Sequence, residues 1–311
     1  MNGKVPPGRE DQATMKGSDT NETCTVKQIE KCRIAIVGLG LMGGSLAGAL
    51  RGKVGAVVGV ARRRETVQAA LKGGLIDEGT TELTAGVKGV DIVVLATPVR
   101  VIVQQIAVVG PHLEENCVLM DLGSTKADIL GEMAKLPEGV QALGGHPMCG
   151  KETSGVEAAE PGIYRGATFI LSPLPRTAEW AVGLGADLAR TVGSEPLVLD
   201  GERQDFLVAT LSHVPYLMAC GLIATADRTT SPDAAAWRIV AGGFRDTTRI
   251  AASDVTMMTD ILVTNREEVL RALGTFQQEI RSLGDLIESS NEEALRRRLG
   301  KIREKRLEMY P

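Results

Sequence analysis

Residues 33–49 read RIAIVGLGLMGGSLAGA, an apolar run that breaks into glycines and then resumes at helical spacing. Residues 34–37 are all apolar, which is typical of a strand buried on both faces. Leu46 and Leu50 lie one helical turn apart, as expected for a helix that packs on this strand. The stretch therefore predicts a strand, a glycine turn and a helix in direct succession.

Between the strand and the helix, Gly38, Gly40 and Gly43 complete the pattern G-x-G-x-x-G. The first glycine permits a tight turn, the second leaves room for a pyrophosphate, and the third lets the helix pack closely on its strand. Free N–H groups at the helix N-terminus then face the anion. A glycine turn without a ligand is the alternative, but the flanking strand and helix favour a dinucleotide site. The expected cofactor loop consists of Gly38, Leu39, Gly40, Leu41, Met42 and Gly43.

Length and composition limit the possible classes of protein. A chain of 311 residues allows two domains, each with its own core. The formal net charge of −4 gives no reason to expect nucleic acid as a partner, and no apolar run approaches the roughly 20 residues of a membrane span. Five cysteines at unmatched spacings fit neither a disulfide framework nor a metal site, which indicates a reducing cytoplasm. Residues 1–32 lack a signal-peptide core and are expected to form a disordered leader.

Apolar strands alternate with helices as far as residue 200. The expected strands after the first lie at residues 56–61, 91–96, 118–122, 141–143, 168–171 and 196–199. This alternation predicts an α/β fold with a doubly wound, mostly parallel sheet of the Rossmann type. Beyond residue 200 no convincing strand appears. We therefore expect a dinucleotide-binding domain over residues 33–200, followed by an all-helical domain over residues 201–311.

The residue that closes the second strand bears on the choice of cofactor. A site for NAD usually has an acid there to bind the ribose hydroxyls, whereas this chain has Ala61 followed by Arg62 and Arg63. Guanidinium groups can clamp a 2′-phosphate, so the sequence favours NADP over NAD. A solvated basic turn is the alternative. Thr97 and Pro98 follow another strand and are expected to pass the cofactor at the same sheet edge.

Two histidines and two arginines are candidates for the chemistry. His146 is expected in a Gly-Gly-His-Pro turn at the carboxyl end of a strand, where its imidazole could take a proton near neutral pH. His213 lies beside Pro215 in an apolar helix that is expected to kink there. Arg245 and Arg249 share a face if their segment is helical, and they could then hold carboxylates of a substrate. The histidines could instead only form hydrogen bonds within a loop or the core, and the arginines could form ordinary salt bridges.

An apolar seam recurs at alternating steps of four and three near the end of the chain. It consists of Val269, Leu273, Phe276, Ile280, Leu283 and Ile287. Such a narrow stripe suits helix packing either within one chain or between two copies.

Taken together, these motifs resemble the prephenate and arogenate dehydrogenases of tyrosine biosynthesis. The matching stretches are GLGLMGGSLA at 38–47, ATP at 96–98, DLGSTK at 121–126, GGHPMCGKETSG at 144–155, SHVP at 212–215 and GGFRDTTRIA at 242–251. The resemblance implies an enzyme that oxidises and decarboxylates prephenate or arogenate with NAD(P)+, and it leaves the choice between these substrates open. It also implies a homodimer through the helical domain, which favours the seam as an interface.

The resemblance further implies roles for individual residues. The histidine matching His146 accepts the proton of the ring hydroxyl, and the serine matching Ser124 helps to orient that histidine and the substrate. The arginine matching Arg249 binds a substrate carboxylate. The other matched pocket residues are Arg245, His213 and Glu152, the last at a position that shapes access.

Two other interpretations compete with this one. The β-hydroxyacid dehydrogenases and imine reductases share the GLGxMG opening, but their catalytic lysine and their glycine-rich serine motif are not found here. A non-catalytic NADP-binding sensor is an interpretation from another class. Such a sensor would not need His146, Ser124 and Arg249 in the register of the dehydrogenases.

Overall fold

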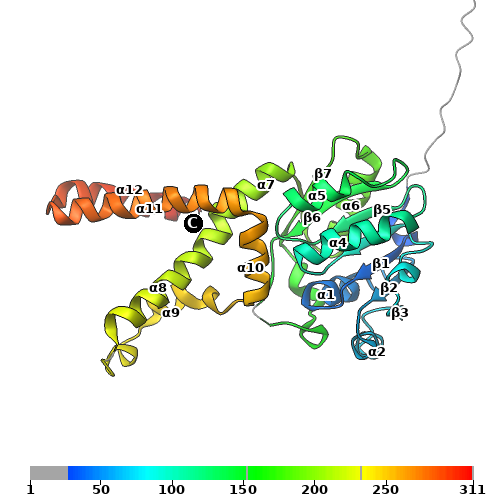
Figure 1. The fold of residues 1–311 in the computed structure, drawn as a ribbon, viewed down its shortest axis with the longest axis horizontal. Helices are drawn as coiled ribbons and strands as arrows, with labels where there is room; N and C mark the ends of the chain where they lie inside the picture. The colour runs from blue at the N-terminus through cyan, green and yellow to red at the C-terminus, as the bar shows by residue number, and fades with distance from the viewer. Residues whose placement is uncertain (1–26, 152, 232, 310–311) are drawn as a thin grey trace, which may run out of the picture.

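The computed structural model describes residues 27–151, 153–231 and 233–309. It consists of a sheet region, residues 27–200, and a helical region, residues 201–309, which extends away from the sheet (Figure 1). Residues 1–26, most of the expected leader, lie outside the described residues. Ile29 and Cys32 are already buried against the core. The packed fold therefore begins ahead of Arg33.

The sheet region contains one eight-stranded sheet. Its strands are β1 (Arg33–Val37), β2 (Ala56–Val60), β3 (Glu78–Thr80), β4 (Ile92–Leu95), β5 (Val118–Asp121), β6 (Gln141–Pro147), β7 (Thr168–Pro173) and β8 (Glu195–Val198). They follow the order β3-β2-β1-β4-β5-β6-β7-β8, and all neighbours pair in parallel except β6 and β7. The predicted mostly parallel α/β fold is confirmed.

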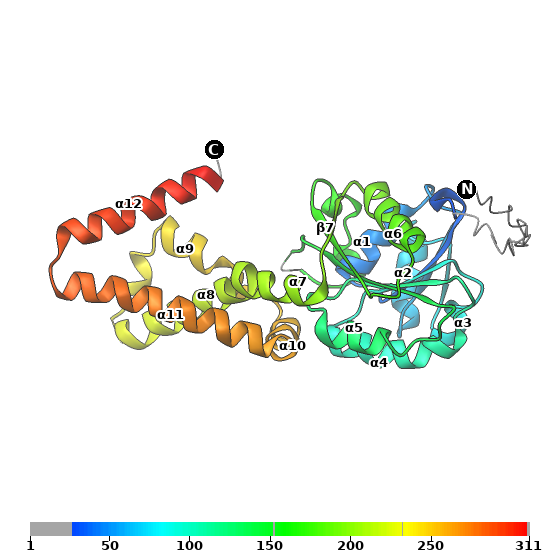
Figure 2. The same cartoon turned by 90° about the horizontal axis from the view of Figure 1, so that it is seen from above.

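Helices cover both faces of this sheet (Figure 2). One face carries α1 (Leu41–Leu50), α2 (Arg64–Lys72) and α6 (Glu179–Thr191), and the other carries α3 (Leu83–Gly86), α4 (Val99–Val109) and α5 (Ala127–Met133). In β1, Ile34 and Ile36 join the hydrophobic cluster of one face, and Ala35 and Val37 join that of the other. This is why residues 34–37 are all apolar, rather than every second one.

The helical region follows the last strand without further sheet among the described residues. Its elements are α7 (Gly201–Val208), a π-helical segment (Ala209–His213), α8 (Val214–Thr230), α9 (Gly242–Thr248), a 3-10 turn (Arg249–Ala252), α10 (Val255–Thr264), α11 (Arg266–Glu288) and α12 (Glu292–Met309). A π-helical segment lies just before Pro215, where a kink was expected, and Pro215 lies in the first turn of α8. Beyond the end of α11, α12 turns back along the region (Figure 2).

From Gly201 to Thr230 these elements form one helical run that is long and apolar enough to cross a membrane, judged by length and composition. The sequence predicts no run of this length. However, the buried Asp205 near its start accepts hydrogen bonds from the backbone N–H groups of Lys126 and Ala127, which belong to the sheet region. The start of the run is therefore a packed helix of this fold.

Candidate active site

The glycine loop after β1 has the geometry that its sequence predicts. Gly38 has φ +99°, and a Cβ there would lie 2.8 Å from the carbonyl oxygen of Ala96. At Gly43 a Cβ would lie 1.9 Å from the carbonyl oxygen of Gly38, whereas at Gly40 it would meet nothing within 4 Å. The first and third glycines thus allow close packing, and the second faces open space.

This open space lies at the N-terminus of α1. The N-cap residue is Gly40, and no side chain accepts the first N–H groups of the helix. The buried Leu39 and Leu41 anchor the loop, and the hydroxyl of Tyr164 donates to the carbonyl oxygen of Met42 at 2.8 Å. A rigid loop with free N–H groups at a helix N-terminus fits the pyrophosphate of a dinucleotide.

The other expected cofactor residues lie at the carboxyl ends of neighbouring parallel strands. Ala61 is buried after β2, and Arg62 and Arg63 are exposed beside it. After β4, the hydroxyl of Thr97 donates to Oε1 of Gln105 at 2.7 Å, and Pro98 is the N-cap residue of α4. The carboxyl ends of β1, β2 and β4 face one edge of the sheet, so the structure brings these residues to the side of the glycine loop.

His146 lies at the carboxyl end of β6, and the prediction that it sits in a turn is wrong. The strand continues through Gly144 and Gly145 to Pro147, because β7 pairs with it and places Ile170 opposite His146. Burial of the imidazole is the largest cause that lowers the pKa of His146, to about 3, with smaller effects from the charges of Lys126 and His213. The imidazole is therefore neutral at pH 7 and able to accept a proton.

Ser124 lies in the loop after β5, and a buried carboxylate connects this loop to the strand of His146. Asp121 accepts hydrogen bonds from the backbone N–H groups of Gly123 at 2.7 Å and Gly145 at 3.1 Å. The fully buried ammonium of Lys126 pairs with the same carboxylate. This pairing holds the Lys126 ammonium in the core of the sheet region.

His213 comes from the helical region and lies close enough to His146 to lower its pKa. Its Nδ1 is 3.4 Å from Nδ2 of Asn265, which also donates to the carbonyl oxygen of Asp205 at 2.8 Å. Burial lowers the pKa of His213 to about 4. Two neutral imidazoles from different regions of the chain thus share one site, together with the Ser124 loop.

The two arginines lie farther along the helical region. Arg245 is in α9 and Arg249 begins the next 3-10 turn, and both side chains are exposed. Both elements pack against α8. Gly243 and Phe244 of α9 line a groove with Ala226 and Thr229 of α8, near the end of that helix away from His213, so the structure does not place Arg245 beside the histidines. Glu152, the remaining expected pocket residue, lies outside the described residues.

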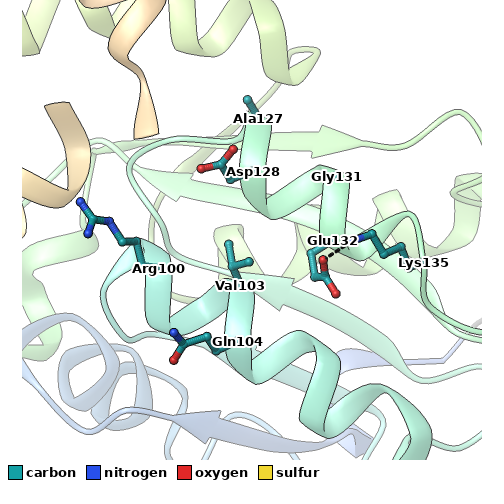
Figure 3. Close-up of a pocket in the computed structure, with 8 residues that line it drawn as sticks. All are labelled: Arg100, Val103, Gln104, Ala127, Asp128, Gly131, Glu132 and Lys135. Carbon is teal, nitrogen blue, oxygen red and sulfur yellow. Dashed lines mark hydrogen bonds and ion pairs between the residues drawn. The ribbon is translucent and has the colours of Figure 1, made fainter. Parts of the chain in front are cut away.

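Polar contacts connect the helical region to the sheet region near this site. Nε of Arg100 lies 2.9 Å from Oδ1 of Asp260, and the hydroxyls of Thr125 and Thr264 are 2.8 Å apart. Arg100 also lines an open groove between α4 and α5, where its side chain lies apart from Glu132 and Lys135 (Figure 3). None of the expected site residues lines that groove, so it is separate from the candidate active site.

Comparison with known proteins agrees with this arrangement. A family model described as the prephenate dehydrogenase nucleotide-binding domain matches residues 46–195, and one described as the prephenate dehydrogenase dimerization domain matches residues 200–301. The chain belongs to the prephenate dehydrogenase family. This family member is 33% identical over 273 residues to the prephenate dehydrogenase of Bacillus subtilis, with 85% of this chain and 72% of that protein covered.

Solved structures of the prephenate dehydrogenase family have the same fold. The prephenate dehydrogenase of A. aeolicus, in complex with hydroxyphenyl propionate and NAD+, superposes with a TM-score of 0.84 at 32% identity and covers 91% of this chain and 100% of its own. Synechocystis arogenate dehydrogenase superposes with a TM-score of 0.79 at 28% identity, over 89% of this chain and 99% of its own. The prediction of an NAD(P)-dependent dehydrogenase of tyrosine biosynthesis is confirmed.

Proposed function

We propose that this enzyme oxidises and decarboxylates prephenate, arogenate or both, with His146 as the general base. The observation that carries the proposal is the neutral, buried imidazole of His146 at the same sheet edge as the glycine loop. General-base catalysis by a histidine needs an unprotonated ring nitrogen at the working pH, and the neutral imidazole of His146 provides one. The ligands named for the A. aeolicus structure, hydroxyphenyl propionate and NAD+, have the chemistry of a product analogue and a hydride acceptor.

In this reaction His146 takes the proton of the ring hydroxyl as a hydride leaves the ring carbon that bears this hydroxyl. NAD(P)+ supplies the hydride acceptor when it is bound on the glycine loop. The bond between the ring and its carboxylate then breaks, CO2 leaves, and the released electron pair completes an aromatic ring. The ring oxygen, left as a phenolate, takes the proton back from the His146 imidazolium. Ser124, in a loop tied to the His146 strand through Asp121, orients the substrate hydroxyl.

The basic and polar groups of the helical region bind the rest of the substrate. Arg249 binds a carboxylate, and Arg245 and His213 complete the pocket. A charge-assisted hydrogen bond to a carboxylate is worth roughly 1.5–3 kcal/mol. Glu152 follows the β6 strand in sequence and is assigned to the access route of the pocket.

NADP is the proposed preferred cofactor. Ala61 offers no carboxylate to repel a 2′-phosphate, and the exposed Arg62 and Arg63 follow it directly. Both residues lie between β2 and α2, and Arg63 is the N-cap residue of that helix. Their position after β2 supports a clamp on the 2′-phosphate.

One assay tests both the reaction and the cofactor. Reduced-cofactor absorbance is followed for prephenate and arogenate, each with NAD+ and NADP+, and kcat/KM is compared. We expect turnover of at least one substrate and a higher kcat/KM with NADP+. A preference for NAD+ would overturn the cofactor assignment, and cofactor binding without turnover of either substrate would favour the sensor interpretation instead.

The protein is proposed to act as a homodimer in the cytoplasm, with a cofactor-binding domain over residues 33–200 and a substrate and dimerisation domain from residue 201 onward. The matching dimerization-domain model and the exposed part of the seam on α11 support the dimer. Cys32, Cys117, Cys149 and Cys220 are free thiols, which supports a reducing compartment. A small cyclohexadienyl acid is the proposed partner in the site.

A further inference from the structure

A buried amide contacts the proposed base from the helical region. Gln204 lies in the first turns of α7, and its side chain is fully buried. Its Nε2 is 3.3 Å from Nδ1 of His146, and its Oε1 is 3.4 Å from the hydroxyl of Ser172 on β7. Neither the sequence motifs nor the proposed mechanism uses this glutamine.

The helix that carries Gln204 is held firmly in place. Asp200 caps α7 by accepting the N–H of Arg203 at 2.7 Å. The next residue, Asp205, accepts the N–H groups of Lys126 and Ala127 at 2.8 and 2.9 Å. These contacts fix the backbone on both sides of Gln204 against the Ser124 loop, so the amide has a defined position relative to the imidazole.

The contact matters because a neutral imidazole carries one proton and can act as a base only at its other nitrogen. If an amide N–H donates to Nδ1 of His146, the proton resides on Nε2 and no lone pair faces the substrate. If the amide carbonyl accepts from Nδ1–H, Nε2 is left free. The two ends of an amide are equal in size, and the hydroxyl of Ser172 can donate or accept, so both neighbours of Gln204 are satisfied in the second orientation.

We propose that Gln204 is a positioning residue, whose side-chain carbonyl accepts Nδ1–H of His146 and so keeps Nε2 free to take the substrate proton. This inference rests on the proposed function. It also connects the two regions, because a residue of α7 sets the tautomer of a base on β6. His146 then has the tautomer with a free Nε2 only when α7 is docked on the sheet region.

The chemistry of an amide suits this position better than that of a carboxylate. The charged or titratable groups around His146 are Lys126 after the β5 loop, Asp121 at the end of β5, Asp205 on α7 and His213 on the π-helical segment. The Lys126 ammonium is already paired with Asp121. A further carboxylate against Nδ1 would stabilise the imidazolium, whereas the neutral amide orients the ring without favouring its charged form.

Two substitutions separate orientation from packing. Gln204→Leu removes the acceptor, and we expect kcat to fall about tenfold, the scale of one lost hydrogen bond, while KM stays nearly unchanged. Gln204→Glu keeps an acceptor and adds a charge, and we expect the acid limb of kcat/KM to move up by about 1 to 3 pH units. Gln141→Leu and Gln141→Glu are matched controls, because Gln141 lies at the other end of β6 and accepts from the N–H of Ala178.

The profiles are measured with whichever cyclohexadienyl substrate the unaltered enzyme turns over. Failure of that enzyme with both substrates would overturn the proposed function. A Gln204→Glu profile that coincides with that of the unaltered enzyme, or shifts equally in Gln141→Glu, would overturn the role of Gln204 alone.

A spectroscopic measurement tests the tautomer without relying on activity or on a variant. The chain has three histidines, so ring 15N signals of the 15N-histidine-labelled protein can be assigned with His146→Asn and His112→Asn. We expect the proton of His146 on Nδ1 and an unprotonated Nε2. A signal set with the proton on Nε2 would contradict the proposal.

Discussion

In the sheet region the apolar side chains are covered within one chain, whereas in the helical region many of them face outward. Ile34 and Ile36 of β1 are fully buried between helices. By contrast, Ile239 is 81% exposed and Ile287 is 65% exposed. Because large exposed apolar surfaces mark interaction sites, this difference supports the proposed dimer, in which a second copy would cover apolar side chains of the helical region.

The two regions also differ in how their buried polar groups are paired. The sheet region satisfies its buried charge internally, through the Asp121 carboxylate, its two backbone N–H donors and the Lys126 ammonium. The helical region contributes His213, Gln204 and Asn265 to the junction with the sheet. The candidate active site therefore combines groups of the sheet region, which matches the nucleotide-binding domain model, with groups whose positions depend on the docking of the helical region.

The largest expected effect concerns His146, the proposed base, which lies in the sheet region. We expect His146→Asn to lower kcat about 10²- to 10⁴-fold, the usual contribution of a general base. Cofactor affinity should be unchanged, because the glycine loop is formed without this side chain. Steady-state kinetics and a fluorescence titration with NADPH check both parts. His112→Asn, an exposed histidine on a 3-10 turn, is the control. Near-normal kcat in His146→Asn would end the assignment of the base.

The next prediction tests whether the sheet region is stabilised by its own buried ion pair. Lys126→Met leaves the buried Asp121 carboxylate without its counter-charge, which should lower the free energy of unfolding by about 3–5 kcal/mol. Urea denaturation at fixed protein concentration measures this loss. The double variant Asp121→Asn with Lys126→Met should recover part of it. Lys135→Met removes an exposed ion pair with Glu132 and should change stability by less than about 1 kcal/mol. Equal stability of Lys126→Met and Lys135→Met would contradict the argument.

Lys126 also illustrates what sequence can and cannot predict. The glycine loop and the central strands could be predicted, because the loop needs glycine at Gly38 and Gly43 and residues 34–37 and 92–95 are all apolar and buried. The burial of Lys126 could not, since it depends on Asp121 and Gly145 meeting across two strands. The extension of β6 through His146 likewise depends on pairing with β7.

The same limit applies to other parts of the fold. Strand β3, Glu78-Gly79-Thr80, has no apolar pattern and exists because β2 pairs with it. Gln204 and Asn265 are polar residues in helical surroundings, and only the packed structure places them against histidines. Their sequence signal is weak, because Gln204 and Asp205 belong to a polar stretch, residues 202–205, that precedes the apolar part of the helical run.

A third prediction tests whether a second copy covers the exposed apolar side chains of the helical region. Ile280 and Ile287 of the seam are 52% and 65% exposed on α11. Fully burying an isoleucine is worth about 1.5–3 kcal/mol, so Ile280→Glu with Ile287→Glu should convert the dimer to a monomer. Sedimentation and light scattering measure the change. Cofactor binding should survive, because the sheet region is complete in one chain. Gln278→Glu adds a charge on the opposite side of α11 and is the control. A dimer that persists in the double variant would exclude the seam as the interface.

The smallest effect concerns the two histidines at the junction. Their folded-state pKa values, about 3 for His146 and about 4 for His213, lie below the unfolded value near 6.5. The unfolded chain therefore binds more protons as the pH falls below 6.5, and stability is lost toward pH 4. At pH 5.5 each histidine should cost about 1.4 kcal/mol relative to pH 7.5. His146→Asn and His213→Asn remove these contributions, so the melting temperature of each variant, at fixed protein concentration, should fall less between the two pH values than that of the unaltered protein. Parallel losses in all three proteins would mean that the junction opens to water and that the docking of α7 is looser than the contacts of Gln204 and Asp205 indicate.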